Sequence, residues 1–176
     1  MGKNIEVFQR RWKTVTNETL SSVRRQLANF NFDNSVVNKD FGESCAEWFD
    51  GELAPRVWFQ QLAEEYPEVA QKFKKHVIGI RISKQIVSKP SQWKGYAITF
   101  VLTILTLFIC YGLLEYFTEM EMINKLILSI VTALLAWNIC RQSFVINKEN
   151  IYKERVVDLY RQQLDEHFKK IMNILS

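Results

Sequence analysis

The residues best suited to chemistry lie near the end of the chain, where the sequence reads RQQLDEH from Arg161 to His167. At about 100° per residue in an α-helix, these two side chains lie roughly 60° to either side of Leu164. Both therefore flank an apolar stripe against which a partner helix would pack. An arginine stabilises the charge of a phosphate and an imidazole moves a proton, which are two requirements of RNA cleavage. The structural interpretation, in which a charged helix simply carries both residue types beside an interface, is the one we favour.

The spacing of Arg161 and His167 resembles the paired arginine–histidine motif of HEPN ribonucleases, all-helical proteins in which two such motifs form one active site at a dimer interface. Gln162 stands where that family usually has Asn, His or Asp. The chain carries one motif, so a second copy would have to complete the site. The resemblance thus implies a divergent ribonuclease motif, and whether the chain is an enzyme stays open, with a non-enzyme favoured.

Other chemical motifs are missing from the sequence. It contains no phosphate-binding glycine loop, dinucleotide fingerprint, nucleophile elbow or metal-ligand cluster. The only histidines are His76 and His167, which leaves few acid–base schemes. The three cysteines, Cys45, Cys110 and Cys140, are far apart and fit neither a disulfide framework nor a zinc site, so we predict reduced apolar fillers. We expect no cofactor and no metal.

Two apolar runs dominate the second half of the chain. Residues 95–114 read GYAITFVLTILTLFICYGLL, carry no charge and, at about 1.5 Å per residue, match a hydrocarbon core of about 30 Å. Residues 123–140 read INKLILSIVTALLAWNIC and are apolar except for Asn124, Lys125 and Asn138 near the ends. The ammonium of Lys125 can reach the interface by snorkelling. Two adjacent runs of this length are rare in soluble proteins, so we predict two transmembrane helices rather than a buried hairpin.

The charges around these runs predict an orientation. Lysine and arginine residues gather before the first run and after the second, whereas the connecting segment, 115–122, carries Glu115, Glu119 and Glu121. The positive-inside rule then places both termini in the cytoplasm and the acidic segment outside. We predict an antiparallel hairpin in the bacterial inner membrane. The net charge of +4 suits an anionic inner leaflet and does not by itself indicate direct nucleic-acid binding.

Small and hydroxyl side chains form a stripe along each predicted span. The stripe on the first span comprises Thr99, Thr103, Thr106 and Cys110. The stripe on the second span comprises Ser129, Thr132 and Ala136. Such residues favour close helix packing in lipid, and they also suit the mildly polar wall of a pore built from several copies. No charge lies deep in either span, so we favour packing over a pore from these residues alone.

The rest of the chain predicts helices outside the membrane. Residues 29–44, NFNFDNSVVNKDFGES, are rich in turn formers and predict a loop. The nearby aromatic residues predict a small helical core rather than a ligand site: Trp48, Phe49, Trp58, Phe59, Tyr66 and Phe73. In residues 147–176 apolar positions recur every three or four residues, which predicts packing against the N-terminal helices or against copies of itself.

The predicted fold is an all-α membrane protein, with a two-helix transmembrane hairpin, a helical cytoplasmic N-terminal region and a long C-terminal helix. Its parts along the chain are a cytoplasmic helical region (1–90), a first span (95–114), an outer loop (115–122), a second span with its inner end (123–146) and a cytoplasmic amphipathic helix (147–176).

The size of the chain, its two predicted spans and the Arg161/His167 motif together resemble the small Csx-type membrane accessory proteins of type VI-B CRISPR loci, specifically the accessory that enhances interference. The resemblance covers the layout of most of the chain and one short motif. It implies a ring-shaped homo-oligomer that permeabilises or depolarises the inner membrane when a neighbouring RNA-guided RNA nuclease detects phage RNA. The threonine stripe would then line the pore, and the motif would be structural or regulatory at a subunit contact.

Three functions are thus open from the sequence. The preferred one is an antiviral-defence membrane protein that oligomerises into a pore. The second is a membrane-anchored ribonuclease that uses Arg161 and His167 across a dimer. The third is a non-catalytic scaffold, such as a bacteriocin immunity protein, that docks a soluble partner through the aromatic N-terminal region.

Overall fold

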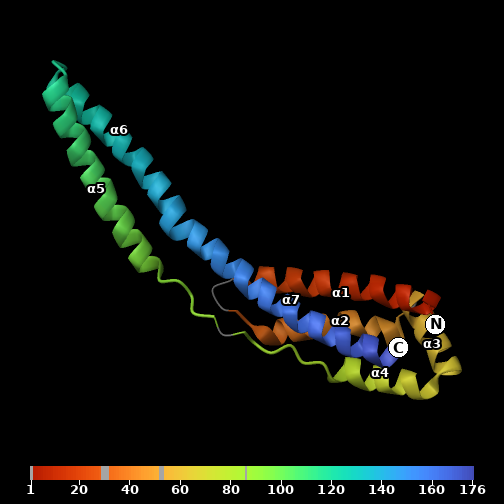
Figure 1. Ribbon diagram of the computed structural model, residues 1–176. Helices are drawn as coiled ribbons and strands as arrows, with labels where there is room; N and C mark the ends of the chain where they lie inside the picture. The colour runs from red at the N-terminus through yellow and green to blue at the C-terminus, as the bar shows by residue number, and fades with distance from the viewer. Residues whose placement is uncertain (1, 29–31, 52–53, 86) are drawn as a thin grey trace. The chain divides into compact units, whose positions relative to one another are not determined.

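The structure, a computed structural model, describes residues 2–28, 32–51, 54–85 and 87–176, with only the backbone of residues 2–4. Each regular element in these ranges is a helix, which confirms the all-helical prediction. The helices are α1 (Gly2–Ala28), α2 (Asn34–Asp50), α3 (Ala54–Glu65), α4 (Pro67–Gly79), α5 (Gln92–Phe117), α6 (Met122–Arg141), a π-helical turn η1 (Gln142–Ile146) and α7 (Asn147–Leu175) (Figure 1). The chain forms two compact units, residues 1–86 with 155–176 (the helical unit) and residues 87–154 (the apolar unit).

Helix α2 occupies most of the segment for which the sequence predicts a loop, so that prediction is wrong for residues 34–44; residues 29–31 lie outside the described ranges. Asp33 caps the helix, because its carboxylate accepts a hydrogen bond from the Ser35 N–H at 2.8 Å. One face of α2 is buried at helical spacing, through Val37, Phe41, Cys45 and Trp48. This packing outweighs the poor helix propensity of the polar residues between them.

An aromatic cluster around Phe8 of α1 forms the core of the helical unit. The Phe8 side chain is fully buried, and its ring centroid lies 5.8 to 5.9 Å from those of five other rings: Trp12, Trp48, Trp58, Phe73 and Phe168. Such pairs contribute about 0.5–1.5 kcal/mol each beyond the burial of their area. The predicted aromatic core is therefore confirmed for Trp48, Trp58 and Phe73, whereas Tyr66 is exposed.

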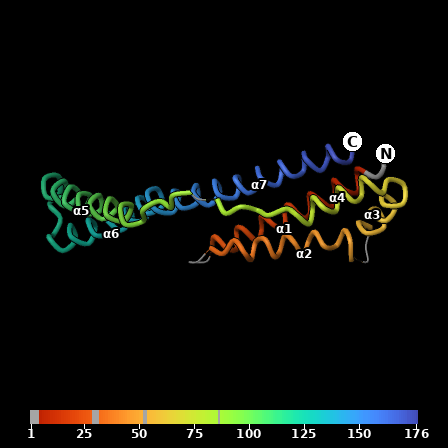
Figure 2. Tube along the Cα trace, turned by 90° about the horizontal axis from the view of Figure 1, so that it is seen from below, coloured from red at the N-terminus to blue at the C-terminus, as the bar shows by residue number. Residues whose placement is uncertain are grey.

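The apolar face of α7 packs within the chain, against the N-terminal helices. Val157, Tyr160, Leu164 and Ile171 are fully buried, and the ring of Phe168 stacks on that of Phe8. In Figures 1 and 2 the C-terminal part of α7 lies alongside α1 and α4. Of the two partners that the sequence allows, the N-terminal helices are the one observed.

Side-chain amides hold the extended segment after α4 in place between α2 and α7. Asn38 of α2 accepts a hydrogen bond from the Ile82 N–H and donates one to the Ile82 carbonyl, both at 2.9 Å. Gln163 of α7 likewise accepts a hydrogen bond from the Ser83 N–H at 2.9 Å and donates one to the Ser83 carbonyl at 3.1 Å. The Tyr160 hydroxyl donates to Asn34 at 2.6 Å. The backbone groups of Ile82 and Ser83 are thus satisfied by side chains rather than by a neighbouring strand.

In the apolar unit α5 and α6 lie side by side, joined by residues 118–121 (Figure 1). Gly95 allows a close approach to η1, because a Cβ there would lie 2.8 Å from the carbonyl oxygen of Phe144. Near the connecting segment, Lys125 donates to Glu115 at 3.0 Å. Helix α5 extends beyond the predicted 95–114, so Glu115 lies in the helix and not in the connecting segment.

The outer surface of α5 and α6 is apolar and uncovered. Phe108, Leu135 and Ile139 are each at least 60% exposed, as are other large apolar side chains of both helices. Helix α5 and the continuous helix Met122–Leu175 are long and apolar enough to cross a membrane. We call these outward-facing apolar side chains of α5 and α6 the apolar belt. No other part of the described chain covers it.

The α7 packing predicts a large cost for Ile171→Ala, because truncating a fully buried isoleucine leaves a cavity. We expect about 2–5 kcal/mol of lost stability in the helical unit. Ile78→Ala is the matched control: Ile78 on α4 is 55% exposed, so its truncation is expected to cost within about 0.5 kcal/mol. Denaturant unfolding of the full chain in detergent, followed by near-ultraviolet circular dichroism, measures both. Equal losses in the two variants would contradict the packing described here.

Candidate functional site

Arg161 lies on the exposed side of α7. Its Nη1 donates to the carboxylate of Asp158 at 3.2 Å, one turn earlier in the same helix. Exposed pairs of this kind contribute little stability, because water and salt screen them. The guanidinium is therefore occupied by a local ion pair and lines none of the described clefts.

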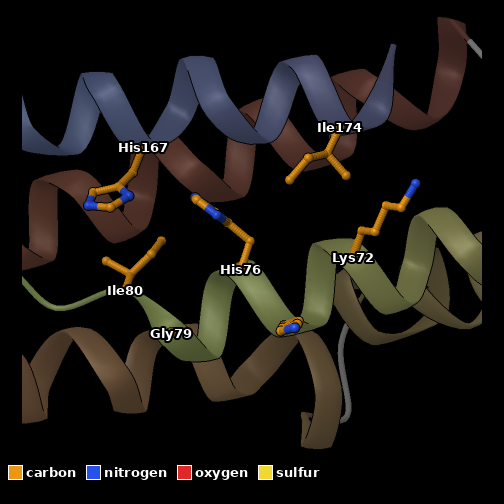
Figure 3. A pocket seen from close by; sticks show the side chains of 7 residues that line it. Lys72, His76, Gly79, Ile80, His167 and Ile174 are labelled. Carbon is orange, nitrogen blue, oxygen red and sulfur yellow. The ribbon is translucent and has the colours of Figure 1, made fainter.

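His167 faces a different partner, His76 of α4. The two imidazole centroids lie 5.6 Å apart with their planes tilted by 54°. Figure 3 shows the two rings pointing toward one another from the facing helices. The structure thus joins the only two histidines of the chain, although 90 residues of sequence separate them.

The two imidazoles lie in an open cleft of about 430 Å³ between α4 and α7. The residues that line it are Lys72, Lys75, His76, Gly79, Ile80, His167 and Ile174. The isoleucines contribute apolar surface on either side of the histidines, and the ammonium of Lys72 lies toward one end (Figure 3). We refer to this site as the histidine cleft.

The surroundings of the histidine cleft disfavour the protonated form of both imidazoles. Burial is the main cause that lowers the pKa of His76 below its usual 6.5, and the charge of Lys170 lowers it further. Burial likewise lowers the pKa of His167, helped by His76 and Lys170 and opposed by Glu166. The Nε2 of His76 and the Nδ1 of His167 are buried without a hydrogen-bond partner among the described groups. Each imidazole thus has one buried nitrogen without a bonding partner among the described residues.

The chemistry open to the histidine cleft follows from these groups. A neutral imidazole can accept a proton, and it becomes a hydrogen-bond donor at both nitrogens once protonated. Two imidazoles alone fall short of the three or four protein ligands of a typical zinc site. The described residues contain no cluster of three or more metal-ligating side chains. The nearby lysines favour anions over cations.

The threonine stripe of α5 lies on the protected face of that helix. Thr99 is fully buried, and Thr103, Thr106 and Cys110 are half-buried, while the residues between them are mostly exposed. The three hydroxyls donate to carbonyl oxygens one turn earlier at 2.8 to 2.9 Å. The opposite stripe on α6 includes the fully buried Ser129. This geometry is that of two helices in close contact.

The acidic residues of the predicted outer loop differ in their surroundings. Glu115 pairs with Lys125, whose side chain is buried between the helices close to the connecting segment, so this buried charge is neutralised. Glu119 and Glu121 are exposed in the connecting segment. They retain the acidic character on which the predicted orientation depends.

Sequence reasoning missed His76 and the lysines as members of a site. The available signal was that a chain with two histidines has one in the basic stretch KFKKH, residues 72–76, and the other on an amphipathic helix. Nothing in the spacing joins residues of α4 to residues of α7, because their proximity depends on the tertiary packing of the helical unit.

Any functional argument for this chain rests on its own residues and geometry. No protein-family model, curated protein or solved structure matches it.

The lowered histidine pKa values predict an acid-sensitive helical unit. In the unfolded chain His76 and His167 take up protons near pH 6.5, whereas in the folded chain they do so only at lower pH. The free energy of unfolding is therefore highest above pH 6.5 and decreases as the pH falls below that value. Replacing both histidines (His76→Gln with His167→Gln) should flatten this dependence between pH 8 and 5.5. Denaturant midpoints across that range measure it, with near-ultraviolet circular dichroism at pH 8 to verify folding. An unchanged slope in the folded double variant would contradict the assignment.

Proposed function

We propose that this chain is an integral membrane protein in which α5 and α6 cross the bilayer as an antiparallel hairpin. The observation that carries the proposal is the uncovered apolar belt of these helices. At about 25 cal/mol per Å² of apolar surface, exposing such a belt to water would be costly, and lipid removes that cost. Intrahelical hydrogen bonds already satisfy the backbone, as a hydrocarbon environment requires.

Charge supports the orientation that belongs to this proposal. Lys89 and Lys94 precede or begin α5, and Arg141 and Lys148 follow the apolar part of α6, whereas Glu119 and Glu121 lie at the opposite ends of both helices. The basic ends belong in the cytoplasm and the acidic connection outside. The helical unit would then be a cytoplasmic domain, with the bacterial inner membrane as the location.

We also propose an activity for the chain held in the membrane by this hairpin. Copies of the chain assemble, and the assembly permeabilises the membrane in support of an RNA-guided RNA nuclease. The support is the resemblance in layout and the apolar belt, which provides surface for copies as well as for lipid. Because the threonine stripe packs on α6, its hydroxyls can line a channel only if the contact between α5 and α6 opens. A closed resting hairpin is consistent with an effector that acts after a trigger.

The ribonuclease alternative lacks a supporting observation in the described residues. It requires Arg161 and His167 to act on one phosphate, and the first pairs with Asp158 while the second faces His76. A scaffold that docks partners through the N-terminal aromatic residues is also disfavoured, because Trp48, Trp58 and Phe73 are buried in the core. The membrane effector is therefore the function we retain.

Reconstitution of the purified chain into liposomes that hold a small dye tests the proposed activity. We expect cross-linked oligomers and dye release, alone or with the activated nuclease complex. Phe108→Arg, which places a charge on the exposed belt, should abolish insertion and release, since a central arginine costs about 2.5–3.5 kcal/mol on insertion scales. Val57→Arg, at a 53% exposed position of α3, is the control that should retain both. A monomeric chain in tight liposomes under every trigger would overturn the proposal.

The double substitution of Thr103→Val with Thr106→Val tests the stripe as a channel wall. Valine keeps the shape and removes the hydroxyl, so insertion should persist and release should slow severalfold. Thr14→Val is the matched control, because the Thr14 hydroxyl makes the same bond to a carbonyl one turn earlier outside the spans. Unchanged release in the double variant would assign the stripe to packing alone.

A further inference from the structure

The histidine cleft has features of a binding site that the proposed membrane function does not use. It is open, it holds two imidazoles with unpartnered buried nitrogens, and α4 and α7 bring together residues that are distant in sequence. Buried polar atoms in a folded protein are nearly always hydrogen-bonded to protein, water or ligand. The Nε2 of His76 and the Nδ1 of His167 have no such partner among the described residues, and the second nitrogen of each imidazole can donate to a ligand in the cleft.

The charges around the cleft define what that ligand is. Lys72 and Lys75 of α4 line it, and Lys170 of α7 is close enough to affect both imidazoles electrostatically. Glu166 is the acidic group that acts on His167. Three ammonium groups against one carboxylate repel a divalent cation and attract an anion. Lysine is a common point-charge ligand of phosphate groups in proteins.

The apolar part of the lining adds a second requirement. Ile80 is nearly fully buried and Ile174 half-buried, and they flank the histidines in Figure 3. Free inorganic phosphate has nothing to place against them. An anion whose phosphate is attached to an apolar or aromatic body satisfies both the lysines and the isoleucines.

We propose that the histidine cleft binds a phosphate monoester with an apolar or aromatic body, held by Lys72, Lys75 and Lys170, with His76 and His167 as hydrogen-bond donors to its oxygens. This site is independent of the membrane activity proposed above. A nucleoside monophosphate and a lysophospholipid headgroup share the required chemistry, so the phosphate monoester is the class that we assign.

Binding at this site must be coupled to protons. Without ligand, burial and the lysines lower both histidine pKa values below 6.5. A dianionic phosphate favours the charged imidazoles and raises the same pKa values. Affinity should therefore increase as the pH falls from 8 through the pKa of the complex, until the phosphate itself takes up a proton at about pH 6.

Histidine NMR on the full chain in detergent tests the proposal directly, since the chain gives signals from only two imidazoles. The experiment follows both midpoints by long-range proton–nitrogen spectra from pH 5 to 8. Adding AMP should raise both midpoints by about 0.5 pH units or more. Lysophosphatidic acid is the second probe: a response to AMP assigns a soluble source, and a response to the lipid alone assigns a headgroup. Midpoints that neither probe moves would overturn the proposal.

A pair of neighbouring substitutions separates binding from general charge. Lys170→Gln should raise both midpoints of the free chain, because one cation is removed, and should reduce the response to AMP severalfold. Lys169→Gln removes the same charge from the neighbouring exposed position, which acts on neither imidazole, so it should leave the response unchanged. Equal effects of the two variants would show nonspecific attraction and would refute a built site.

Discussion

The uncovered apolar belt of α5 and α6 is the constraint on which the rest of the apolar unit depends. Large aliphatic and aromatic side chains point outward, and the small and hydroxyl residues point toward the other helix. This is the reverse of a water-soluble helical pair. The hydroxyls of the stripe are satisfied within their own helix, and Lys125 is neutralised by Glu115. These polar groups thus have partners before any lipid or further chain is added.

In the helical unit the large apolar side chains instead lie inside. Its stability comes from the burial of aromatic rings around Phe8 and of the apolar face of α7. Polar side chains of α2 and α7 then fix the extended segment that follows α4, through the bonds to Ile82 and Ser83. Among the described helices, α7 is the one that contributes residues to both units. The same helix also presents His167 to α4.

The sequence predicts well what depends on local pattern. Long uncharged runs identify α5 and α6, and the three-to-four spacing of α7 identifies the face that is buried. Sequence patterns do not predict the parts of the structure that depend on tertiary contacts. The polar segment before Cys45 is helical because Val37 and Phe41 are buried in the core. The local sequence does not show which residues form that core. Likewise Phe8 is one apolar residue among several on α1, and only its five neighbouring rings make it central.

The candidate site shows the same division. Residue types and spacing drew attention to His167 together with Arg161, whereas the fold places His167 opposite His76. Helical geometry gives the directions in which side chains leave one helix. It does not give the neighbour that they meet, which depends on how α4 and α7 pack in the helical unit. The lysines of the histidine cleft could therefore be recognised only from the structure.

Accessibility of single cysteines to a membrane-impermeant thiol reagent tests the central claim, a hairpin with both ends inside. The native thiols are suited to this, since Cys45 is buried with its pKa raised to about 12 by burial, and Cys110 and Cys140 are half-buried in apolar helices. Glu119→Cys should react in intact cells, whereas Glu64→Cys, exposed on α3, should react only after the membrane is opened. Equal labelling of the two in intact cells would contradict the account.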